Sequence, residues 1–60
     1  MAAKFEVYTD SKGQFRFRLK AANGEIVATG ESYASKAGAL KGVDAVKRAA
    51  ASAEVDDQTG

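Results

Sequence analysis

The alternation of apolar and basic side chains between Phe15 and Lys20 constrains the fold of this chain more than any other feature. The segment reads FRFRLK, so its apolar and basic side chains lie on opposite sides of an extended backbone. This period of two predicts a β-strand over Gln14–Ala21, with one face in the interior and the other in solvent. Because an apolar sheet face is stable only when another element covers it, the chain must also supply a cover.

Two further strands are predicted beside this one, each separated from it by a turn. Lys4–Thr9 alternates in the same way, and Glu25–Thr29 forms the third strand. The first turn is a cluster of turn-forming residues at Asp10–Gly13. The second contains Asn23 and Gly24, the preferred pair for a two-residue type I′ turn. Three strands joined in this way predict an antiparallel meander.

A helix over Lys36–Ala51 is predicted to cover the sheet, with Ser35 as its N-cap. Apolar residues at three- and four-residue spacing should face the sheet: Leu40, Val43, Val46 and Ala50. Small residues form a second face: Gly38, Gly42, Ala45 and Ala49. After the helix, Ala53–Asp56 is a candidate short strand with Val55 as its large apolar residue. The predicted fold class is therefore α+β.

The small number of large apolar residues predicts that the chain assembles with a second copy of itself. Its 60 residues form one domain, 1–60, with an ordered core of about 4–56. Much of its 45% hydrophobic content is alanine, which removes little apolar surface from water. Small domains usually add disulfides, a metal or a partner subunit. The sequence has no Cys and no His, so a homodimer is the expected solution.

The residue types also limit the chemistry that this chain can perform. Without His and Cys, the common pairs of nucleophile and base are unavailable, and the carboxylates are scattered. We therefore expect no enzyme activity, assign no catalytic or metal-binding residue, and expect no cofactor. No apolar run reaches the length of a membrane span, and the start lacks the apolar core of a signal peptide. The expected location is cytoplasmic, with no membrane partner.

The basic side of the second strand is a candidate binding surface. Arg16, Arg18 and Lys20 share one face with Tyr8, whose ring could stack on a base while the cations meet phosphates or an acidic partner. The alternative is a solvated sheet face on which Glu6 pairs with an arginine across the strands. The sequence favours this alternative, because the net charge is only +1. Nucleic-acid binding is therefore possible but not favoured.

The start of the predicted helix is a candidate site for a small anion. Ser35 and Lys36 lie where free backbone amides attract negative charge. The competing interpretation is an N-capping serine followed by an exposed lysine, and it is favoured because serine caps are common.

Several segments of the chain together resemble the YegP-like family of small bacterial and archaeal proteins. The resemblance covers about Lys4–Asp56 and rests on these segments: Lys4–Tyr8, Gly13, Phe15–Lys20, Ala22–Ile26 and Gly30–Lys36. It implies a β-β-β-α-β unit that occurs as a homodimer or as a tandem repeat. It also implies that two units share a sheet by exchanging their C-terminal strands, here Ala53, Glu54, Val55 and Asp56. The resemblance implies no particular biochemical activity, so the expected function is a non-enzymatic homodimeric module.

Overall fold

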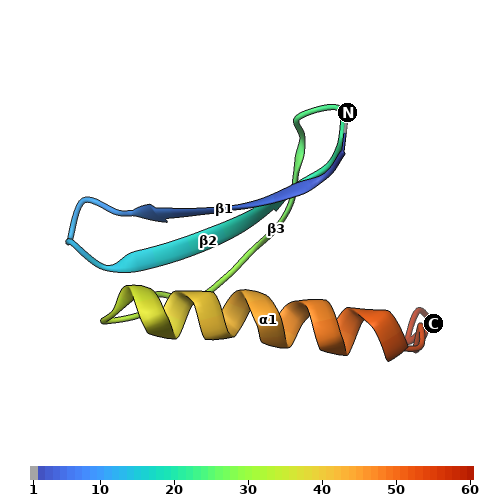
Figure 1. Cartoon of the computed structure of the whole chain (residues 1–60). Helices are drawn as coiled ribbons and strands as arrows, with labels where there is room; N and C mark the ends of the chain where they lie inside the picture. The colour runs from blue at the N-terminus through green and yellow to red at the C-terminus, as the bar shows by residue number, and fades with distance from the viewer. Residues whose placement is uncertain (1) are drawn as a thin grey trace.

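Three antiparallel strands precede a single long helix (Figure 1). The computed structural model describes residues 2–60. Its elements are β1 (Lys4–Thr9), β2 (Phe15–Lys20), β3 (Ile26–Thr29) and α1 (Lys36–Ser52). The sheet order is β1-β2-β3, and α1 lies against one face of it (Figure 1). The predicted α+β meander is confirmed, because the period of two and the turn residues are local signals that fix the strands.

Both hairpin turns end in a glycine with left-handed backbone, Gly13 at φ 77° and Gly24 at φ 89°. In the second turn the N–H of Gly24 donates to the carbonyl of Ala21 at 2.9 Å. The prediction of a two-residue type I′ turn is wrong, because Asn23 does not adopt positive φ. The loop has three residues, a type I turn followed by a glycine bulge. The side-chain oxygen of Asn23 instead accepts from the N–H of Glu25 at 3.0 Å.

The core lies between α1 and the face of the sheet that carries the aromatic residues of β1 and β2. The register pairs Val7 with Phe17 and Phe5 with Leu19, so the apolar positions of the two strands meet on one side. Phe17 is 4% exposed, and the Phe5 ring packs edge-on against it with centroids 6.1 Å apart. Phe17 therefore forms the centre of the core.

The helix approaches the sheet through its small residues. Ala39 is fully buried, and Gly42 lies beneath two aromatic rings. A Cβ added to Gly42 would lie 2.8 Å from Cζ of Tyr33 and 3.0 Å from Cε2 of Phe17, so a larger residue would push the helix outward. This close approach explains why a glycine occupies the interior of a helix.

The apolar face of α1 is rotated from the one predicted. Val43 and Val46 are half-buried as expected, but Leu40 is 49% exposed and Ala50 is also exposed. Because Ala39 and Gly42 lie against the sheet, Leu40 turns toward the flank of the helix, and the small residues Ala45 and Ala49 farther along the helix are exposed. The predicted inward position of Leu40 and Ala50 is therefore wrong for the single chain.

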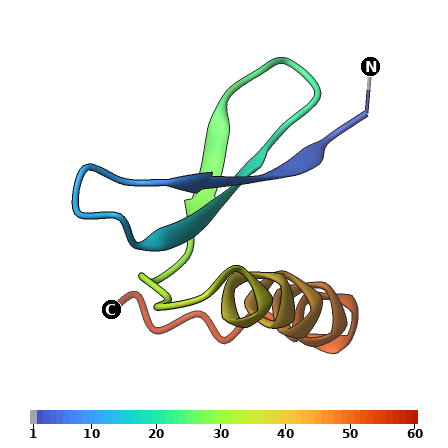
Figure 2. The same ribbon diagram turned by 60° about the vertical axis from the view of Figure 1, so that its left-hand side comes forward.

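The two ends of α1 differ in how closely they follow the sequence prediction. The hydroxyl of Ser35 accepts from the N–H of Gly38 at 3.1 Å, which confirms the predicted N-cap. The helix ends at Ser52, and Ala53 is extended. None of the described residues after Ser52 belongs to a strand, so the strand predicted over Ala53–Asp56 does not form within the single chain. The tail lies beyond the end of α1, apart from the sheet (Figures 1 and 2).

Candidate functional site

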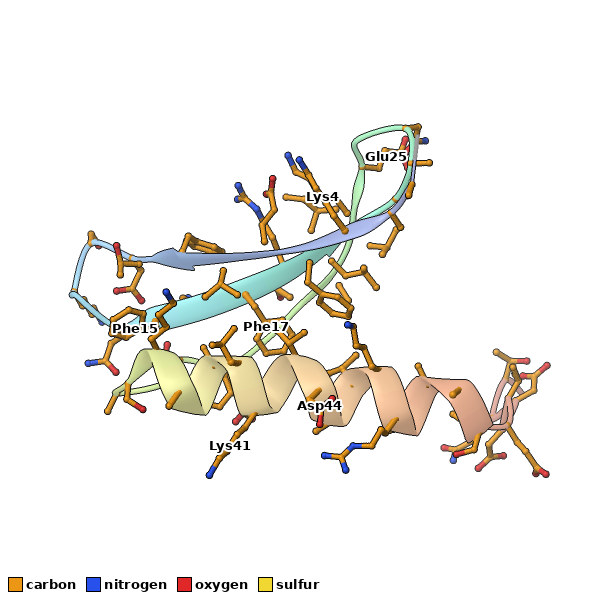
Figure 3. All side chains as sticks on the ribbon, in the orientation of Figure 1. Lys4, Phe15, Phe17, Glu25, Lys41 and Asp44 are labelled. Atoms are coloured by element: carbon orange, nitrogen blue, oxygen red, sulfur yellow. The ribbon has the colours of Figure 1, made fainter. Side chains whose placement is uncertain are left out.

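The sheet face turned away from α1 gathers the charged side chains of the first hairpin. We call it the outer face and define it by six residues of β1 and β2: Lys4, Glu6, Tyr8, Arg16, Arg18 and Lys20. Figure 3 shows Lys4 on this side of the sheet, directed away from the helix. The structure therefore places the four candidate residues of the predicted binding surface together with Glu6, and it adds Lys4 to them.

Glu6 is the centre of an ion-pair cluster on the outer face. The Nε of Arg18 donates to Oε1 of Glu6 at 2.7 Å. The Nζ of Lys4 lies 3.5 Å from Oε2, and the Nζ of Lys20 lies 3.6 Å from Oε1. The predicted cross-strand pair of Glu6 with an arginine is confirmed. One carboxylate thus faces three cations, and two positive charges remain uncompensated.

This cluster shifts the titration of its carboxylate. The hydrogen bond from Arg18 lowers the pKa of Glu6 below its usual range, and the positive charge of Lys20 adds to this effect. Partial burial raises this pKa, more strongly than Lys20 alone lowers it but less than the Arg18 hydrogen bond does, so the net shift is downward. Glu6 therefore stays ionised at any pH near neutrality.

The two arginines have distinct surroundings. The guanidinium of Arg18 lies over the Tyr8 ring, 4.8 Å from its centroid, in a cation–π contact. A terminal N–H of Arg16 donates to the carbonyl of Gly30 at 3.3 Å. The buried Nε of Arg16 has no hydrogen-bond partner among the described residues. Arg18 thus belongs to the ion-pair cluster around Glu6, whereas Arg16 contacts the backbone that follows β3.

A hollow of about 440 Å³ opens at the end of the hairpin beside the second turn. Seven residues line it: Ala2, Lys4, Lys20, Ala21, Ala22, Asn23 and Gly24. The register places Lys4 directly opposite Lys20, and like charges in this position repel. Sequence reasoning missed Lys4, because its role depends on the register of the hairpin.

The candidate anion site at the start of α1 lies apart from the outer face. The hydroxyl of Ser35 already accepts a hydrogen bond from the N–H of Gly38, and Lys36 is exposed. Because α1 covers the opposite side of the sheet, these two residues do not join the basic residues of the hairpin (Figure 1). Anion binding by Ser35 and Lys36 stays a prediction.

Several large apolar side chains remain exposed to solvent. Ile26 is 52% exposed and Val27 is 58% exposed, and both belong to the edge strand β3. Leu40 on the flank of α1 is 49% exposed, and Val55 in the tail is 94% exposed. Exposed apolar residues on a strand edge are typical of a surface that pairs with another chain.

Neither a metal cluster nor a membrane span is found in the part of the chain that the structure describes. No group of three or more carboxylates gathers among residues 2–60 in a way that could hold an ion. Within the same residues, α1 is too short and too polar to cross a bilayer.

Comparison with known proteins identifies relatives along most of the chain. A family model with the description "Domain of unknown function (DUF1508)" matches residues 10–57. A "UPF0339 protein" of Treponema denticola is 56% identical over 55 residues, which cover 92% of this chain and 95% of the relative. The solution structure of a protein from Haloferax volcanii, 46% identical, superimposes with a TM-score of 0.84. The match covers 93% of this chain and 95% of the other.

One relative is considerably longer than this chain. The "UPF0339 protein in ptx operon 5'region" of Stutzerimonas stutzeri is 50% identical over 48 residues. Those residues make up 80% of this chain but only 43% of the relative. The relative is therefore long enough to hold two units of this size.

Proposed function

Because this chain belongs to the DUF1508 family, which includes the YegP-like UPF0339 proteins, we propose that it acts as a non-enzymatic homodimeric module. The observation that carries the proposal is the imbalance between buried and exposed apolar residues. Among the described residues, Phe17 and Ala39 are the buried hydrophobic side chains, whereas four large ones are at least 49% exposed. A second copy can cover what the single chain leaves in water.

The dimensions of the single chain support the same conclusion. Its accessible surface is 4746 Å², whereas a compact monomer of 6.3 kDa exposes about 3,700 Å². Its radius of gyration is 13.1 Å, whereas a compact domain of this length has about 10 Å. The excess surface, about 1,000 Å², is comparable to what one partner buries in a standard interface, about 800 Å².

We place the contact between the C-terminal segment of one copy and an edge strand of the other. Every residue of β3 is exposed, and β3 forms an edge of the sheet. Ala53–Asp56 is a short segment with extended backbone at its start, and it lacks a pairing partner within the described chain. Pairing the two would satisfy both backbones and bury Val55 and Val27. The longer relative from Stutzerimonas is consistent with two such units in one chain.

Size-exclusion chromatography with light scattering tests this proposal. One copy of the chain has a mass of 6.3 kDa, and the full chain at micromolar concentration should have twice this mass. A chain that ends after Ser52 should be monomeric and less stable, because it lacks the exchanged segment. The matched control ends after Asp56 and should remain dimeric. A compact monomeric full chain, with a melting temperature unchanged by either truncation, would refute the proposal.

The cytoplasmic location stays a prediction.

A further inference from the structure

We propose that the outer face of the sheet binds single-stranded nucleic acid through its phosphates, without strong sequence preference. This function is independent of dimer formation, because addition of a strand extends a sheet at its edge and leaves the outer face open. Three features of the outer face support it: the distribution of charge, the hollow beside Lys4 and Lys20, and the position of Tyr8.

The outer face concentrates positive charge that the whole chain does not show. Its four cationic side chains oppose one carboxylate, Glu6, which gives the face a charge of +3. The net charge of the chain is +1, so the remainder carries −2. The low net charge, from which the sequence favoured a solvated face, therefore does not describe this surface, because the local field at one face determines what approaches it.

The hollow at the end of the hairpin offers a position for a phosphate group. Lys4 and Lys20 are directly opposite in the register and both line it. Each ammonium lies 3.5 to 3.6 Å from Glu6, whose Oε1 already accepts a shorter bond from Arg18. An anion between the two lysines would relieve their mutual repulsion. Asn23 and Gly24 of the second turn border the same hollow.

The row of cations and the ring favour a nucleic acid over an acidic polypeptide. Alternate residues of β2 stand about 6.8 Å apart, which places its basic side chains in a regular row along the strand. Successive phosphates of an extended single strand repeat at a similar spacing. Tyr8 lies beside this row, with the Arg18 guanidinium over its ring. Aromatic rings and guanidinium planes are the surfaces on which unpaired bases stack.

Fluorescence anisotropy of a labelled oligothymidylate, titrated with the full chain, tests the proposal. If three phosphates are engaged, affinity should fall about 20-fold between about 50 and 200 mM salt, a log–log slope of about −2. The double variant Lys4→Gln with Lys20→Gln should reduce the magnitude of this slope by about 0.7, because the two lysines share one phosphate. The matched control, Lys41→Gln with Lys47→Gln, removes the same charge from exposed positions of α1 and should leave the slope unchanged.

Further variants keep the result interpretable if the double variant unfolds. Lys4→Gln alone changes a side chain that is 66% exposed, and circular dichroism will verify its fold. Glu6→Gln removes the negative charge from the outer face and should tighten binding several-fold. The proposal is overturned if the oligonucleotide does not bind at low salt, or if the α1 control weakens binding as much as the outer-face variants. Equal competition by polyglutamate or by a duplex would likewise overturn the assignment to single strands.

Discussion

The ring of Phe17 stacks on the ring of Tyr33, with centroids 6.1 Å apart and planes inclined by 22°. Tyr33 is held there by its backbone, which exchanges two hydrogen bonds of 2.8 Å with Phe15. The connection between β3 and α1 is thus anchored to the start of β2. This pair of rings determines how closely the helix can approach the sheet, and Gly42 is the residue that allows it.

Replacement of Gly42 by alanine should therefore destabilise the protein. The added methyl group would overlap the rings of Tyr33 and Phe17, and overpacking of this kind costs roughly 1–3 kcal/mol. The higher helix propensity of alanine returns about 0.8–1.0 kcal/mol. We expect a net loss near 1 kcal/mol, which lowers the melting temperature by roughly 4–8 °C in thermal unfolding.

Gly38→Ala is the matched control for this substitution. It changes the same residue type four positions earlier in the same helix, but its Cβ would lie 3.3 Å from Oγ of Ser35 and 3.4 Å from Cδ1 of Tyr33. These are contacts that a small adjustment can accommodate. Its melting temperature should stay unchanged or rise, and an equal fall in both variants would contradict the packing argument.

Phe17→Ala should unfold most of the protein. Truncation of a buried phenylalanine costs roughly 3–5 kcal/mol, and a chain of this length has about 3–9 kcal/mol in total. Phe17 is 4% exposed and contacts the rings of both Phe5 and Tyr33. Urea denaturation followed by circular dichroism measures the loss. Phe5→Ala, at a half-buried position, should lose clearly less stability, and the reverse order would show that the core is centred elsewhere.

Stability should fall in acid through protonation of Glu6. Its pKa is lowered in the folded state, chiefly by the hydrogen bond from Arg18. A carboxylate of this kind stabilises the fold above its unfolded pKa of about 4.3, and this contribution disappears as pH falls through the folded value. Melting temperatures between neutral pH and acid should decline in this window. Glu6→Gln should be less stable at neutral pH and should show a smaller decline, and parallel curves would exclude Glu6 as the cause.

Val27→Lys should weaken the proposed dimer with little effect on the fold of the single copy. Val27 is 58% exposed on β3, so its replacement removes little buried contact within the chain. A charged side chain at a strand edge discourages pairing with another strand. Light scattering over a dilution series should show dissociation at higher concentration than for the parent chain. Val27→Thr keeps the branched shape and should dissociate much like the parent, and equal behaviour of both variants would place the interface elsewhere.

The sequence alone determined the elements and their order. The alternation from Phe15 to Lys20 fixed the central strand, and Ser35 fixed the start of the helix. Gly13 and Gly24 marked both turns, although the second proved one residue longer than its Asn-Gly pair suggested. These features are local, because residues close in the chain decide strand period, capping and turn geometry.

Only the tertiary structure decided how these elements face one another. The rotation of α1, which buries Ala39 and exposes Leu40, depends on rings that come from β2 and from the loop before the helix. Lys4 lies opposite Lys20 because of the register of the first hairpin, in which β1 and β2 pair along their full length. Packing and register bring together residues that are distant in sequence. The periodicity of a single segment therefore cannot predict these contacts.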